Sequence, residues 1–192
     1  MAFGLPSFQQ KNTNPYGPQG PNFRKIILFS VLGFILLVII LLVMNTILSA
    51  PKDSFMTFLG REQFLSDTVA GSQKRIRSGD LAKLNSDSTL LLSSDNVALL
   101  AQLQKKFNQT KLDDTTKKQQ VDATVATSLK SAELLDKFDV TYRNILLEKI
   151  DQLLATAPSV RDSLGGNDFK AVMNKYINDL RSIESQLDAL NL

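Results

Sequence analysis

The chain has 192 residues, 43% of them hydrophobic, with a formal net charge of +3, which is enough for one soluble domain and one apolar segment. It contains no cysteine and no histidine, so disulfides, thiolate ligands, cysteine nucleophiles and histidine bases are excluded. The three basic residues Lys11, Arg24 and Lys25 precede position 26 without any acid, and the remainder holds 19 basic and 19 acidic residues. A neutral domain does not indicate nucleic-acid binding, and we expect no nucleic-acid partner.

Residues 1–25 are rich in proline, glycine, asparagine and glutamine. Such a segment cannot bury enough apolar surface to offset the entropy lost on ordering. We therefore predict a disordered tail. Alternatively, its apolar residues Phe3, Leu5, Phe8 and Tyr16 form a short docking motif.

Residues 26–48 contain no charge and no proline over 23 positions. As a helix they would reach about 34 Å, and the hydrocarbon core of a bilayer is about 30 Å thick. The apolar core of a cleaved signal peptide is shorter, and Pro51 would follow the candidate cleavage site, which favours an uncleaved signal anchor. Gly33 has no small residue four positions away, so the segment lacks a helix-pairing motif.

The charges that flank this segment predict its orientation. Arg24 and Lys25 abut one end, whereas Lys52 beyond the other end is followed by Asp53. The positive-inside rule then places residues 1–25 in the cytoplasm, 26–48 across the cell membrane as a single-pass anchor, and 49–192 outside the cytoplasm. The lipid bilayer is the first partner that the sequence predicts.

From residue 50 onward the apolar residues recur at helical spacing. Pro51 suits the first turn of a helix, and Ser78 to Asp80 contain a stop and a candidate N-cap for the next helix. Serine and aspartate around Ser93–Asp95 compete for backbone hydrogen bonds, which predicts a kink or break in that second helix. The first helix has the apolar stripe Phe55, Phe58, Leu59, Leu65, Val69 and Ile76, and the second has Leu81, Leu84, Leu91, Leu92, Leu99, Leu100, Leu103 and Phe107.

After a polar loop at 108–114 and a weakly apolar segment at 115–129, a further helix follows Phe138 and is expected to end at Ala157, before Pro158. Asn167 is the expected N-cap of the last helix. That helix carries a heptad seam, which could face the core of a bundle or another chain; the core is favoured because a four-helix bundle needs this stripe. The seam residues are Phe169, Met173, Tyr176, Leu180, Ile183, Leu187 and Leu190.

No segment alternates with the period of a half-buried strand. The predicted fold class is all-α, with one N-terminal transmembrane helix followed by an antiparallel helical bundle of about four helices.

The sequence offers no catalytic set. Di-metal helical bundles use Glu-x-x-His pairs, which this chain cannot form because it has no histidine. No phosphate-binding loop motif is present. We therefore predict no catalytic, cofactor-binding or metal-binding residue, no cofactor, and no enzyme activity. Glu62 is the one carboxylate on or beside an apolar stripe, and we expect it to be exposed or at the stripe edge, with a buried ligand role as the alternative.

The segment 132–154, AELLDKFDVTYRNILLEKIDQLL, opens a helix with Phe138–Asp139 and has Tyr142 soon after. It resembles bacterial envelope proteins of unknown function with a ferritin-like four-helix bundle. The resemblance implies a helical bundle in the cell envelope and does not point to any activity. Since the histidines of that family are missing here, no metal site carries over. The domain is also similar to the sensor bundles of chemoreceptors, but it could signal only through a partner.

Two functions follow from these observations. The leading prediction is a membrane-anchored, non-catalytic helical module for envelope structure or protein interaction, with an unknown protein partner or a second copy. The alternative is a ligand- or metal-binding bundle of ferritin-like or sensor type, which would signal through a partner. A buried carboxylate cluster or a bundle cavity would favour the alternative.

Overall fold

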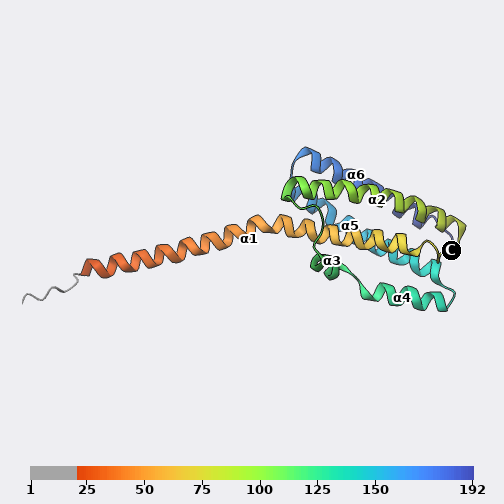
Figure 1. Cartoon of the computed structure of the whole chain (residues 1–192), viewed down its shortest axis with the longest axis horizontal. Helices are drawn as coiled ribbons and strands as arrows, with labels where there is room; N and C mark the ends of the chain where they lie inside the picture. The colour runs from red at the N-terminus through yellow and green to blue at the C-terminus, as the bar shows by residue number, and fades with distance from the viewer. Residues whose placement is uncertain (1–20) are drawn as a thin grey trace, which may run out of the picture. The chain divides into compact units, whose positions relative to one another are not determined.

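The computed structural model describes the backbone of residues 21–192 and the side chains of 31, 33–40 and 50–192. This part of the chain forms α-helices and contains no strand, which confirms the all-α class. The helices are α1 (Pro21–Ser72), α2 (Gly79–Phe107), α3 (Asp114–Gln120), α4 (Ala123–Leu134), α5 (Phe138–Leu164) and α6 (Asn167–Asp188) (Figure 1).

The chain divides into two compact units, Met1–Thr46 and Ile47–Leu192. Most of the predicted tail lies outside the described residues, but α1 already begins at Pro21, so positions 21–25 are helical rather than disordered. The predicted anchor, 26–48, lies largely outside the described side chains. Among the residues that could be searched, no helix combines the length and the apolar character needed to cross a membrane.

The unit Ile47–Leu192 is a helical bundle whose long helices run antiparallel to their neighbours (Figure 1). Lys105 pairs with Asp168 at one end of α2 and Asp95 with Lys175 further along, at 2.5 and 2.6 Å, so α2 and α6 run in opposite directions. The same reversal relates α1 to α2 and α5 to α6, through the pairs Val69–Asn85, Glu62–Asn96, Leu187–Arg143 and Asn174–Arg161.

The core lies between α1, α2, α5 and α6. Aromatic rings fill the space between the diagonal pair α1 and α6: Phe55 meets Phe169 edge-on at 5.2 Å between ring centroids, and Phe58 meets Tyr176 at 5.5 Å. Such rings bury large apolar areas and favour this tilted geometry. The confirmed bundle therefore has four long helices and, in addition, the short helices α3 and α4.

The helices α3 and α4 return the chain from the end of α2 to the start of α5. This return is needed because α2 and α5 run parallel. The first part of it passes close to α1, where a Cβ added at Gly60 would lie only 2.6 Å from Cγ of Gln120. Glycine therefore permits the approach, and the Nε of Arg61 donates to Oε1 of Gln120 at 3.2 Å beside it.

Three predicted helix boundaries are wrong. Pro51 stands inside α1 and Pro158 inside α5, although each proline removes one intrahelical hydrogen bond. Ala157 and Val160 are buried on either side of Pro158, so packing keeps this turn helical. Asn167 is the first residue of α6 rather than its cap, which is Gly166.

The break predicted near Ser93–Asp95 is also wrong, since α2 continues without interruption to Phe107. Asp95 is buried in this helix and accepts a hydrogen bond from Lys175, which lies on α6. A side chain with a tertiary partner no longer competes for the backbone of its own helix.

Candidate functional site

The residues that the sequence singled out fall into two groups. Arg24 and Lys25, the predicted flanks of the anchor, lie outside the described side chains. The seam faces the interior of the bundle: Leu190 is partly buried against the core, and the other members are buried, namely Phe169, Met173, Tyr176, Leu180, Ile183 and Leu187.

Glu62 is fully buried in α1, so the expectation of an exposed or edge position is wrong. Its Oε2 accepts a hydrogen bond of 2.6 Å from the Nδ2 of Asn96, and its Oε1 has no partner. Burial raises the pKa of Glu62 to about 8, since the carboxylate has lost its hydration; the Asn96 hydrogen bond opposes this, and the charges of Asp95 and Asp67 add to it. At neutral pH the side chain is therefore mostly protonated.

Asp95 and Tyr176 complete a buried polar cluster with Glu62. Asp95 turns Oδ1 to the Nζ of Lys175 at 2.6 Å, while its Oδ2 has no partner. Burial raises the pKa of the Asp95 carboxyl, and the hydrogen bond from Lys175 opposes that rise. The hydroxyl of Tyr176 is buried without a partner, and its pKa is raised by burial and then by the nearby charges of Glu62 and Asp95.

We call Glu62, Asp95 and Tyr176 the buried carboxylate cluster. It draws one residue each from α1, α2 and α6. A buried polar atom without a partner costs about 1–3 kcal/mol, and burial raises the pKa of both carboxyl groups, so the cluster favours a bound proton. The cluster can hold a proton near neutral pH, but it contains no nucleophile with an adjacent base.

A second buried polar network joins α1, α2 and α5. The hydroxyl of Tyr142 donates to Oδ1 of Asn85, whose Nδ2 donates to the carbonyl of Val69 at 3.1 Å and to Oε1 of Gln73 at 2.5 Å. Burial raises the pKa of Tyr142, which keeps the hydroxyl protonated. This network is satisfied, and its effect is to hold the three helices in register.

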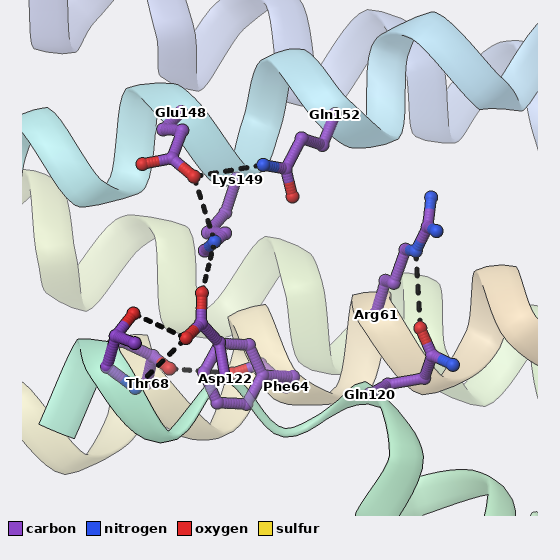
Figure 2. Close-up of polar contacts among 9 residues, drawn as sticks. Arg61, Phe64, Thr68, Gln120, Asp122, Glu148, Lys149 and Gln152 are labelled. Carbon is purple, nitrogen blue, oxygen red and sulfur yellow. Dashed lines mark hydrogen bonds and ion pairs between the residues drawn. The ribbon is translucent and has the colours of Figure 1, made fainter.

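Figure 2 shows the polar contacts that fasten the α3–α4 connection to the bundle. Asp122, the N-cap of α4, accepts from the Nζ of Lys149 at 2.8 Å, and Lys149 also reaches Glu148 at 2.9 Å. The hydrogen bond from Lys149 is the main reason that the pKa of Asp122 falls to about 2. These polar groups hydrogen-bond to one another. The hollow of about 570 Å³ beside them is therefore lined by groups with a structural role.

At the end of the bundle where α5 begins lies a groove of about 630 Å³, the distal groove, lined by residues 74–78, 133, 136–140 and 191–192. The carboxylate of Asp139 accepts from the backbone N–H of Ser78 at 2.7 Å and of Arg77 at 3.1 Å. The guanidinium of Arg75 lies 4.4 Å from the Phe138 ring centroid. These contacts give the Phe138–Asp139 step a structural role.

Two large apolar side chains project from the turn that adjoins the distal groove. Leu134 is 82% exposed and Leu135 is 68% exposed. Glu133, which precedes them, pairs with Arg75 at 2.8 Å. The α4–α5 turn thus places apolar surface directly beside ionic groups, a combination found in protein interfaces.

Within residues 50–192 and the other described side chains, no group of three or more acidic residues could hold a metal ion. Comparison with protein-family models, with curated proteins and with solved structures finds no match to this chain. The resemblance to envelope proteins therefore stays a prediction.

The sequence contains a pattern that indicates part of the buried carboxylate cluster. Along α2 the buried positions step by four and three residues, and polar residues occupy part of that seam. Asp95 belongs to it, although competition for backbone hydrogen bonds around Ser93–Asp95 predicts a kink or break there. The seam runs through Leu81, Asn85, Ser88, Leu92, Asp95, Leu99 and Gln102.

The raised pKa of Glu62 predicts that the free energy of unfolding falls as the pH rises. Because the folded-state pKa of about 8 exceeds the ordinary value of 4.5, the stabilising effect of the proton is complete below pH 4.5 and is lost as the pH rises through 8. The slope contributed in that window approaches about 1.4 kcal/mol per pH unit. Urea unfolding followed by circular dichroism between pH 5 and 9 measures it.

In the Glu62→Gln variant this slope should disappear, because glutamine does not titrate. Glu148→Gln, which changes an exposed glutamate on α5, is the matched control and should unfold with the slope of the wild type. Equal slopes in the wild type and in Glu62→Gln would contradict the assignment.

Proposed function

We propose that this protein is a single-pass membrane protein that holds a non-catalytic helical module at the membrane surface for protein interaction or envelope structure. One observation carries the membrane assignment. Residues 33–40 are all exposed, although seven of the eight are large and apolar. Eight consecutive residues cover every side of a helix, and a helix that is apolar all round suits a bilayer.

The sequence around these residues supports the same proposal. The uncharged run from 26 to 48 has the length of a membrane span, and Arg24 and Lys25 supply the positive charge expected on the cytoplasmic side. In this arrangement the tail lies in the cytoplasm and the bundle lies outside it. The resemblance of segment 132–154 to envelope proteins is compatible with that location.

Charged substitutions in the exposed apolar segment should block membrane insertion. We expect Leu37→Lys combined with Val38→Lys to move most of the protein from the carbonate-resistant membrane fraction to the soluble fraction. Each lysine at the centre of a span costs about 2.5–3.5 kcal/mol. Leu90→Lys, which changes an exposed leucine of α2 outside the apolar run, should leave the distribution unchanged. Membrane retention of the double variant would refute the proposed anchor.

The interaction role rests on the distal groove and the neighbouring leucines Leu134 and Leu135. Exposed apolar residues are common when scattered, but a contiguous pair bordering a groove with convergent charged groups is typical of a binding surface. Leu90 and Val97 on α2 are also exposed, but they are one heptad apart and adjoin none of the described grooves.

A photo-crosslinking amino acid in place of Leu135 should capture a discrete partner or a second copy in intact membranes. The same probe in place of Leu90 should give no specific product, which makes it the control for background labelling. Identical product patterns at both positions would rule out a binding surface at the α4–α5 turn.

The second candidate function, a ligand-binding or sensor-type bundle that signals through a partner, is favoured by the buried carboxylate cluster. Glu62 belongs to α1, the helix that also contains the proposed anchor. With a pKa of about 8, its charge changes close to physiological pH. The proton is the ligand that these residues are best suited to hold.

A further inference from the structure

A small pocket lies at the end of the bundle where α2 ends and α6 begins. It measures about 210 Å³ and is lined by residues from the last turns of α2 and the first turn of α6. We call it the proximal pocket. Phe55, near the start of the α1 portion of the bundle, packs beneath it, with its ring centroid 5.2 Å from that of Phe169. Its lining residues are Gln102, Lys105, Lys106, Gly166, Asn167, Asp168 and Phe169.

The backbone and side chains of the proximal pocket favour an anion. No side chain caps α6, so the N–H groups of its first turn point outward with the positive end of the helix dipole. Lys106 reaches the carbonyls of Leu164 and Gly165 at 3.1 and 3.0 Å and stays within 5.2 Å of the Phe169 ring centroid. Its charge is therefore held at the pocket.

Lys105 supplies a second and more available charge. It pairs with Asp168 at 2.5 Å, but the two side chains are 63% and 72% exposed. An exposed ion pair of this kind contributes little to stability, so Lys105 can turn to an incoming anion at small cost. The lining then carries two lysines and one aspartate, a net positive charge.

Gln102 provides an independent sign of a ligand. Its side chain is only 9% exposed, it lines the proximal pocket, and its Oε1 has no hydrogen-bond partner. Buried amide oxygens normally accept a hydrogen bond. A ligand that combines an anionic group with a hydroxyl donor would satisfy both the α6 N-terminus and this oxygen.

We infer that the proximal pocket binds the headgroup of an anionic phospholipid that carries hydroxyl groups, such as phosphatidylglycerol. The phosphate would lie at the first turn of α6 beside Lys105, and a headgroup hydroxyl would donate to Oε1 of Gln102. This inference rests on the proposed membrane anchor, because only three residues of chain separate a span at 26–48 from Lys52 in the bundle.

The short stretch of chain between the apolar run and the bundle favours a lipid over free phosphate. Lys52 is four residues beyond the apolar run, so the chain keeps it within about 14 Å of the end of a span at 26–48. Its Nζ lies 5.8 Å from the Phe107 ring centroid, and Phe107 follows Lys106, which lines the pocket. Basic residues and aromatic rings are typical of the membrane interface.

The test uses the full chain in neutral detergent, with phosphatidylglycerol or phosphatidylcholine added and bound lipid counted by native mass spectrometry. We expect the wild type to retain phosphatidylglycerol roughly tenfold more tightly. Lys105→Gln combined with Gln102→Leu should reduce this preference to near unity. Lys117→Gln combined with Lys118→Gln, which removes two charges from α3, is the control and should keep the preference.

Equal retention of the two lipids by the wild type, or an undiminished preference in the Lys105→Gln, Gln102→Leu variant, would overturn the inference. Millimolar inorganic phosphate provides a further arm: if it raises the thermal midpoint as much as phosphatidylglycerol does, the site is for free phosphate and the lipid assignment is wrong. Circular dichroism checks that each variant is folded. Membrane fractionation of the same proteins tests the anchor separately, because lipid selectivity in detergent does not depend on insertion.

Discussion

The bundle depends on burying the apolar stripe of α6. Each member of the stripe from Phe169 to Leu187 is buried, and the aromatic contacts of Phe55 with Phe169 and of Phe58 with Tyr176 join α6 to α1 across the core. Because α6 has polar residues on its remaining faces, it has no stable position outside this contact. The antiparallel order of the four helices and the return path through α3 and α4 follow from covering that stripe.

Within this apolar core the protein keeps polar groups that a purely structural bundle could dispense with. The Asn85–Tyr142 network is satisfied and specifies the register of α1, α2 and α5. The buried carboxylate cluster is different, since Glu62, Asp95 and Tyr176 each retain an unpaired oxygen. The protein tolerates this arrangement because Glu62 can remain neutral, and tolerance of that kind makes stability sensitive to pH.

The parts of the fold that follow from periodicity could be predicted from the sequence. The seam of α6 and the helix that follows Phe138 are examples, since apolar residues at helical spacing indicate which face of a helix is buried. The predicted helix end at Pro158 is wrong because the burial of Val160 outweighs local preference. The predicted break near Asp95 is wrong because Asp95 pairs with Lys175. Tertiary context overrides propensity in this way when enough apolar area is buried.

The candidate sites were less predictable for a different reason. The distal groove depends on contacts such as Ser78 with Asp139, and the proximal pocket on Lys105 with Asp168, each pair about sixty residues apart in the chain. No local pattern encodes such pairs. Glu62 lies on or beside an apolar stripe of the sequence, but its hydrogen bond from Asn96 forms only when α2 folds against α1.

Topology tests the proposed function most directly, because we propose that the chain crosses a membrane once, with its tail inside and its bundle outside. Because the sequence has no cysteine, single cysteines placed at Ser7 in the tail and at the exposed Ser93 on α2 can be labelled unambiguously. With a membrane-impermeant maleimide on intact cells or spheroplasts, we expect labelling of Ser93→Cys, and labelling of Ser7→Cys only after permeabilisation. Protection of Ser93→Cys in intact cells, or equal labelling of both in a soluble fraction, would contradict it.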